Sequence, residues 1–198
     1  MASDVRALMS ALEIEEAILV GLSMGGYVAL AFYRNYPGAV RAMVLADTRA
    51  SADTAESRAR RLKAAEKAVR EGASAIADDI LPMLLGRSTI ESRPEVVSRV
   101  RSMIDANDPN GIAAAQRGMA HRPDSTYILA GINCPVAILV GSEDVLTPVS
   151  EAEALRNGIP HSTMRVIQGA GHLPNIEDPA QFNSAVSEFI RGLKKTDQ

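Results

Sequence analysis

The 198-residue sequence has no tryptophan and only one cysteine, Cys134. A single cysteine cannot form a disulfide within the chain, so the fold has to be held together by its apolar core. Cys134 precedes Pro135 and an apolar run, which favours a structural thiol over a reactive one. The lack of a disulfide framework fits a reducing compartment, and we therefore expect a cytoplasmic protein.

Two further shortages exclude classes of partner. The 21 lysines and arginines are outnumbered by 24 aspartates and glutamates, for a net charge of -3, so no basic surface for nucleic acid is expected. No apolar run approaches the length of about 20 residues that a membrane-spanning helix needs. The first residues, Met1 to Arg6, lack the pattern of a signal peptide. The sequence thus predicts a soluble protein without a membrane or nucleic-acid partner.

Histidine is also scarce, with three in the chain. They are scattered, and no cysteine or carboxylate stands at metal-ligand spacing from them, so no metal site is expected. What the chain does contain is 46% apolar residues over a length that suits one domain with a sizeable core.

Four short runs of mostly apolar residues read as strands. They cover residues 17–22, 42–46, 135–140 and 162–167. Helical patterns separate them, which predicts an α/β fold with a mainly parallel sheet of about four strands and helices on both faces. We expect Ser3 or Asp4 to cap a first helix, Thr147 to cap a helix with Pro148 in its first turn, and Asp178 to open the last helix in capping-box style, to about residue 193.

Residues 51–123 have a different residue pattern, in which no segment resembles a strand. Helical patterns cover residues 55–72, 75–85, 94–105 and 110–120. We interpret this segment as a helical cap. It is inserted between core parts 1–50 and 124–198 of a single domain.

A serine among glycines follows the first strand, in the sequence Gly21-Leu22-Ser23-Met24-Gly25. This G-x-S-x-G pattern, with a strand before it and a helix after it, is typical of a nucleophilic serine on a sharp turn. The turn exposes the Ser23 hydroxyl and directs the Met24 backbone N–H toward a developing oxyanion. The glycine-rich loops that bind phosphate or dinucleotides have different sequence motifs, so both kinds of loop are excluded here.

A nucleophilic serine needs a base, and the carboxyl ends of parallel strands are where active groups gather. His172 follows the fourth strand, in a loop that begins Gly169-Ala170-Gly171. His161 precedes that strand and so lies at the wrong end, and His121 lies in the insertion. The pattern therefore favours His172 as the base.

Two aspartates follow strands and are candidates for the acid that orients the base. Asp144 follows the third strand and Asp47 follows the second. We favour Asp144 and interpret Asp47 as a helix cap or loop hydrogen-bonding residue, although either position is able to reach the imidazole. The chain order is then Ser23, Asp144, His172, the order of the α/β-hydrolase elbow proteins.

On these residues the chain resembles the α/β-hydrolase superfamily, from residue 17 to about residue 193. The resemblance is most specific in three segments, residues 21–26, 141–148 and 169–179. The first is similar to the elbow of ester and enol-lactone hydrolases and of cofactor-free haloperoxidase-like esterases. The resemblance implies Ser23 as nucleophile, His172 as base, Asp144 as acid, and the helical insertion as the family's cap.

The function that follows is a serine carboxylesterase acting on small esters with short acyl chains, without a cofactor. Leu22 beside the nucleophile, and Met83, Met103 and Met119 on the cap helices, are candidate residues for an apolar acyl pocket. The methionines can equally well pack the cap against the core. Two alternatives stay open: a degraded, inactive scaffold with an interaction role, and a lactonase or perhydrolase with the same triad.

The sequence departs from the family pattern before the elbow. Members usually carry several strands ahead of the elbow strand, whereas here one helix precedes it, so the source of a second oxyanion donor is open. The elbow strand around Ile18 to Val20 is expected at a sheet edge. Because an apolar edge strand exposes unpaired backbone groups, we expect a homodimer that covers it.

Overall fold

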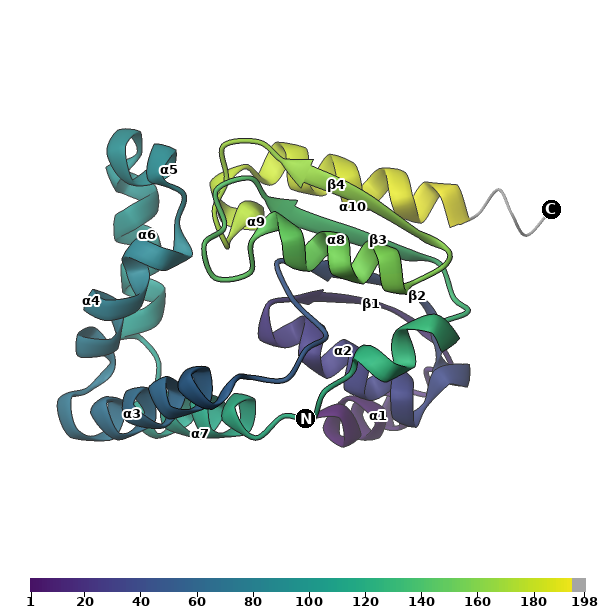
Figure 1. Ribbon diagram of the computed structural model, residues 1–198, viewed down its shortest axis with the longest axis horizontal. Helices are drawn as coiled ribbons and strands as arrows, with labels where there is room; N and C mark the ends of the chain where they lie inside the picture. The colour runs from purple at the N-terminus through teal and green to yellow at the C-terminus, as the bar shows by residue number, and fades with distance from the viewer. Residues whose placement is uncertain (194–198) are drawn as a thin grey trace.

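The computed structural model describes residues 1–193 of the chain. Its centre is a sheet of four parallel strands in the order β1-β2-β3-β4 (Figure 1). The strands are β1 (Ala17–Leu22), β2 (Val40–Ala46), β3 (Val136–Gly141) and β4 (Ser162–Ile167). The predicted α/β fold with a parallel four-stranded sheet is thus confirmed.

Helices cover both faces of the sheet, as Figure 1 shows. Because side chains alternate across a strand, Met43 and Leu45 of β2 face one helical layer while Val44 faces the other. The first layer contains α1 (Ala2–Ala11), α2 (Met24–Asn35) and α8 (Val149–Gly158), and the second contains α10 (Pro179–Leu193). Short connecting helices are η1 (Pro37–Ala39), η2 (Thr126–Gly131) and α9 (Pro174–Glu177).

The segment between β2 and β3 is helical and stands to one side of the sheet (Figure 1). Its helices are α3 (Ala55–Glu71), α4 (Ala73–Leu84), α5 (Arg87–Ser92), α6 (Pro94–Asp105) and α7 (Pro109–Ala120). Buried alanines, among them Ala65 and Ala113, let α3 and α7 pack closely. We refer to α3–α7 as the cap. Within residues 1–193, no helix combines the length and apolar character that crossing a membrane requires.

Asp53 holds the two ends of the cap segment together. Its carboxylate lies 2.5 Å from Arg61 Nε and 2.6 Å from Arg122 Nη1, and the Asp53 side chain is 3% exposed. Arg122 also donates to the carbonyl of Ser51. Residues that enter the cap and residues that leave it therefore meet at one buried carboxylate.

The predicted helix caps have mixed outcomes. Asp178 does cap α10, since its Oδ1 accepts the Gln181 N–H at 2.9 Å. The prediction for Thr147 was wrong, because α8 starts at Val149 after Pro148, and the Thr147 hydroxyl donates to Asp144 instead. The first helix begins at Ala2 without a side-chain cap, so Ser3 and Asp4 lie inside its first turn.

β1 is an edge strand of the sheet formed by the described residues, with β2 as its neighbour. Val20 points away from the first helical layer and is 52% exposed, and Ile14 just before the strand is 40% exposed. Residues 42–46 of the neighbouring strand β2 are fully buried. The expectation of an apolar edge strand around Ile18 to Val20 is therefore met.

The single cysteine lies before β3 and packs against the core layer of α1, α2 and α8. Burial raises the pKa of the Cys134 thiol to about 11. Because the thiolate is the reactive form, this environment keeps the sulfur unreactive. The structural interpretation of Cys134 agrees with this environment.

Candidate active site

Ser23 occupies a strained turn between β1 and α2. Its φ of 52° lies in the left-handed region that residues with a Cβ rarely adopt. A Cβ on Gly21 would lie 2.4 Å from the Gly25 carbonyl oxygen, and one on Gly26 would lie 2.4 Å from the Thr48 hydroxyl. Both glycines are therefore required for the backbone to turn here. Such strain is concentrated at functional sites.

The turn is fastened to β2 by hydrogen bonds. The Ser23 N–H donates to the Ala46 carbonyl at 2.8 Å, and the Thr48 hydroxyl donates to the Ser23 carbonyl at 2.8 Å. A Cβ on Gly25, by contrast, would meet no atom within 4 Å. The side of the turn next to Gly25 thus faces open space, while its other side is packed.

Ser23 and His172 are 149 residues apart in sequence and in hydrogen-bond contact in the structure. Ser23 Oγ lies 2.7 Å from His172 Nε2. His172 follows β4 and is 3% exposed. A hydroxyl at this distance from an imidazole nitrogen is placed to give up its proton as it attacks.

Asp144 contacts the other nitrogen of the same ring. Its Oδ2 lies 2.8 Å from His172 Nδ1, and its Oδ1 accepts the N–H groups of Leu146 at 2.8 Å and Thr147 at 3.0 Å. The Thr147 hydroxyl donates to Oδ2 at 2.6 Å. Ser23, His172 and Asp144 thus form a continuous hydrogen-bonded chain, in which the loop after β3 fixes the carboxylate.

Opposing effects act on the pKa of Asp144. Desolvation raises it, but the hydrogen bond and positive charge of His172, with the donors of Thr147, outweigh desolvation and lower the pKa below its usual value. Asp144 is therefore ionised at neutral pH, as an acid that stabilises an imidazolium has to be.

Asp47, the other candidate acid, lies close by but makes different contacts. It is 1% exposed, and its Oδ1 accepts the Gly141 N–H at 2.8 Å. Burial raises its pKa to about 9, which the Gly141 N–H opposes and the nearby charges of Asp144 and Glu177 reinforce. Asp47 is consequently protonated at neutral pH, whereas Asp144 is not.

Asp47, Asp144 and His172 also have the spacing of a metal site, a cluster that the sequence pattern did not predict. One ligand atom from each lies within 4.8 Å of the others, and all three residues are buried. However, His172 Nδ1 and Asp144 Oδ2 are already hydrogen-bonded, and Nε2 is engaged by Ser23. The arrangement suits proton transfer from Ser23 better than metal coordination.

The His172 loop is packed directly against the cap. The His172 N–H donates to the Leu84 carbonyl at the end of α4, at 3.0 Å. A Cβ on Gly171 would lie 2.2 Å from the Gly86 nitrogen, and one on Gly141 would lie 2.0 Å from the Gly171 carbonyl oxygen. Three backbone segments therefore cross at glycines, which places the cap within hydrogen-bond distance of the loop that carries the base.

Glu177 joins the same segments through its side chain. It is 2% exposed, and its carboxylate accepts N–H groups from Gly86 at 2.8 Å, Gly171 at 2.9 Å and Leu173 at 3.3 Å. Two of these donors flank His172 and the third belongs to the cap. Glu177 lies within the third segment of family resemblance, residues 169–179, but no role was predicted for it. The one feature of the sequence that could have pointed to Glu177 is its place as an acidic residue five positions after His172.

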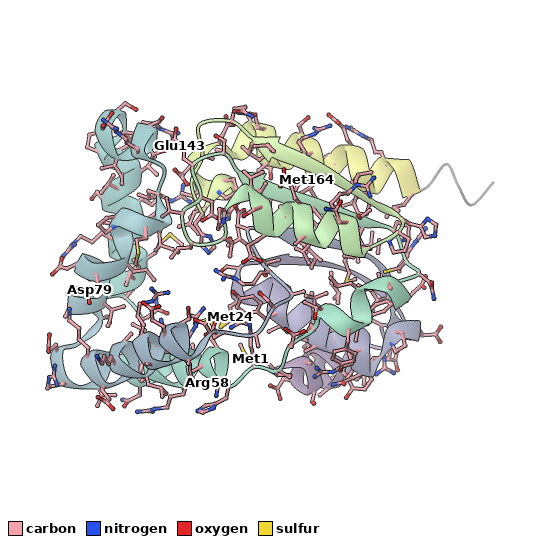
Figure 2. The ribbon with its side chains drawn as sticks, in the orientation of Figure 1. Met1, Met24, Arg58, Asp79, Glu143 and Met164 are labelled. Carbon is pink, nitrogen blue, oxygen red and sulfur yellow. The ribbon has the colours of Figure 1, made fainter. Side chains whose placement is uncertain are left out.

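A second carboxylate supports the cap from the loop after β3. Glu143 accepts hydrogen bonds from the backbone N–H and the hydroxyl of Ser88 in α5. Figure 2 shows Glu143 between the cap and the sheet.

We predict that Glu177→Ala lowers the free energy of unfolding by about 3 kcal/mol, because three buried N–H groups lose a charged acceptor. Urea denaturation measures this loss. Glu188→Ala is the matched control, since Glu188 is a 49% exposed acid paired with Arg165 on the surface, and its removal should cost less than about 1 kcal/mol. Equal losses for the two variants would contradict the assignment of Glu177 as an anchor.

The predicted pocket residues lie in different surroundings. Leu22 ends β1 and packs against the sheet layer covered by α10. Met83 and Met103 on the cap are 38% and 50% exposed. Met119 is half-buried, with its sulfur 3.3 Å from Arg61 Nη1. The two exposed methionines do not fill the core of the cap.

The remaining histidines stay away from the triad. His121 is exposed at the end of α7, and His161 is exposed just before β4. Met24 is the first residue of α2, directly after Ser23. Its N–H is one of the helix N-terminal donors that have no partner within the helix.

Comparisons with known proteins agree with this fold. A family model described as the alpha/beta hydrolase fold matches residues 1–179. The 3-oxoadipate enol-lactonase 2 of Acinetobacter baylyi is 29% identical over 192 residues, which cover 96% of this chain and 70% of that protein.

Two solved structures extend the comparison. A thermophilic esterase from Thermogutta terrifontis, solved with malate bound, is 42% identical and superposes with a TM-score of 0.94, covering 97% of this chain and 71% of the esterase. The enol-lactonase from Burkholderia xenovorans is 27% identical with a TM-score of 0.87, covering 96% of this chain and 71% of the lactonase. This chain thus corresponds to about 70% of the length of these relatives.

Proposed function

Because the chain belongs to the α/β-hydrolase fold family, we propose that it is a serine carboxylesterase that hydrolyses small esters with short acyl chains. The observation that carries the proposal is the hydrogen-bonded chain from Ser23 through His172 to Asp144, with its 2.7 Å and 2.8 Å contacts. The similarity to the Thermogutta terrifontis esterase supports an ester as the substrate.

In the proposed reaction Ser23 Oγ attacks the ester carbonyl while His172 Nε2 takes its proton. Asp144 holds Nδ1 and stabilises the imidazolium that forms. His172 then gives the proton to the departing alcohol, which leaves an acyl group on Ser23. Water, deprotonated by the same imidazole, releases the acid and restores the serine. The chemistry uses the chain's own side chains and needs no cofactor.

We assign the Met24 N–H as an oxyanion donor. Met24 is the first residue of α2, so its N–H is free of helix hydrogen bonds and lies at the positive end of the helix dipole. Each oxyanion donor contributes about 10²–10³ in rate. This one donor therefore accounts for part of the expected acceleration.

We further propose that Leu22, Met83, Met103 and Met119 contact the acyl group. The exposure of Met83 and Met103 on the cap supports this proposal, because neither side chain is buried in the packing between the cap helices. Thioethers adapt to ligands of varied shape, which suits a pocket for small acyl chains.

A lactonase is the second candidate, and the two enol-lactonase relatives favour it. The same triad opens a cyclic ester by the same steps. The remaining alternatives from the sequence are a perhydrolase and an inactive scaffold with an interaction role. The short Ser23–His172 distance speaks against a site that has decayed.

The experiment that tests the proposal compares substrates and labels the nucleophile. The purified chain is assayed with p-nitrophenyl acetate, p-nitrophenyl butyrate and a small lactone, and it is treated with a fluorophosphonate probe. We expect hydrolysis of the esters and labelling at Ser23. Faster turnover of the lactone than of both esters would favour the lactonase. The absence of both hydrolysis and labelling would contradict a serine hydrolase.

We also propose that two chains pair near β1 and that the protein acts in the cytoplasm. The exposed Val20 on an edge strand supports the pairing. We expect light scattering to give a dimer mass at micromolar concentration, and Val20→Lys to shift it toward the monomer, since lysine on an edge strand blocks pairing. A wild-type monomer at that concentration contradicts the proposal.

A further inference from the structure

Asp47 has two energetically unfavourable features, a strained backbone and a buried carboxyl group, that the proposed triad does not explain. Its backbone φ is 45°, in the left-handed region. Its side chain is buried, and within the described part of the chain no N–H or hydroxyl group donates to Oδ2, so the proton that Asp47 carries is shared with the carboxylate of Asp144. Buried polar atoms normally find a partner, and those that do not often have a functional role.

The position of Asp47 points to such a role. It directly follows β2, next to β3, whose following loop carries Asp144. A carboxylate oxygen of each and a ring nitrogen of His172 lie within 4.8 Å of one another. Two adjacent strands thus bring two acids to one imidazole.

We propose that Asp47 is a second positioning residue for His172, able to hold the imidazole through Nδ1 when Asp144 is absent. The proposal rests on the proposed function, because it concerns the same Ser23–His172 pair. The charged or titratable groups around Asp47 are Asp144, Glu177 and His172. Loss of the Asp144 charge removes one cause that keeps Asp47 protonated, so the second acid ionises more easily when it is needed.

Two substitutions of Asp144 separate this role from a single-acid triad. In Asp144→Asn, the loop N–H groups of Leu146 and Thr147 retain the amide oxygen, because they bind Oδ1 in the native chain. The amide NH₂ then faces His172 Nδ1 and forces the ring proton onto Nε2, where it blocks the Ser23 proton. Asp144→Ala has no such donor and leaves Nδ1 free for Asp47.

The activity test measures kcat/KM for p-nitrophenyl acetate in each background. We expect Asp144→Ala to be at least about tenfold more active than Asp144→Asn. We also expect Asp47→Asn to lower the activity of Asp144→Ala at least about tenfold more than it lowers that of the wild type. Equal factors in the two backgrounds would overturn the proposal.

Asp53→Asn is the matched control. It also removes a buried carboxylate, but one that holds the cap ends and lies outside the triad. Its effect should be the same factor in the wild-type and Asp144→Ala backgrounds. Circular dichroism checks the fold of every variant, and if Asp144→Ala is unfolded, Asp144→Val replaces it, since valine also lacks a donor.

A second measurement does not depend on turnover. Nitrogen-15 NMR of labelled histidines reports which ring nitrogen of His172 carries the proton, with His121 and His161 as internal references. We expect the proton on Nδ1 in Asp144→Ala and its loss from Nδ1 in Asp47→Asn/Asp144→Ala. An unchanged tautomer between the two rejects the role of Asp47, even if the wild type proves to hydrolyse no ester. If only the esterase proposal fails, the tautomer of His172 still decides whether Asp47 positions the imidazole.

Discussion

Ser23→Ala is expected to lower kcat for p-nitrophenyl acetate by about 10⁴–10⁶, because the variant cannot form the acyl-enzyme. The imidazole and the Met24 N–H remain, so residual catalysis over water persists through binding and oxyanion stabilisation alone. Stopped assays with high enzyme concentration measure the residual rate, and a fluorophosphonate probe reports the lost nucleophile independently.

Ser10→Ala is the matched control for this loss. Ser10 lies on the exposed side of α1, away from the triad. Its substitution should leave both the ester hydrolysis and the labelling unchanged. Equal rates for wild type and Ser23→Ala would instead mean that the hydrolysis occurs elsewhere on the chain, and the inactive scaffold would become the better interpretation.

Asp47→Asn is expected to change the pH dependence of stability. The folded state keeps the Asp47 proton up to a pKa of about 9, whereas the unfolded chain releases it near 4. Between these values the folded state binds more protons, so this group lowers the free energy of unfolding by about 1.4 kcal/mol for each unit that the pH rises. Asparagine does not titrate, so the variant should lack this decline.

Urea denaturation at pH 5, 6, 7 and 8 measures the effect. The free energy of unfolding of Asp47→Asn, relative to wild type, should rise by about 3–4 kcal/mol from pH 5 to pH 8. Asp53→Asn should give a loss that is constant over this range, because ion pairs with Arg61 and Arg122 lower the pKa of Asp53 despite desolvation. Parallel curves for wild type and Asp47→Asn would mean that Asp47 is ionised in the folded state.

The sequence predicted the sheet well because each strand is short, apolar and bounded by turn residues. Residues 17–22 and 162–167 are strands at the predicted bounds, and the other two differ by one or two residues at their ends. The rule that parallel strands gather functional groups at their carboxyl ends then selected Ser23, Asp144 and His172. These are the residues that the structure brings into hydrogen-bond contact.

The hydrogen-bond partners of individual side chains were harder to predict. Thr147 has the spacing of a helix cap, but its hydroxyl serves Asp144, three residues earlier. Glu177 bonds Gly86, which is 91 residues away. Nothing local signals the Glu177 contact, because backbone donors have no sequence signature. The protonation of Asp47 could likewise not be predicted from the sequence, because it depends on how deeply the folded chain buries the carboxyl group.

The crossing of Gly86, Gly171 and Gly141 has a consequence for how substrate enters. Any movement that lifts α4 from the sheet breaks the Leu84–His172 hydrogen bond and takes Gly86 away from Glu177. The base would lose its orientation in the same motion that opened a path. The cap is thus fixed at this corner, and a lid movement compatible with catalysis has to pivot about Gly86, with the far end formed by α3 and α7 swinging instead.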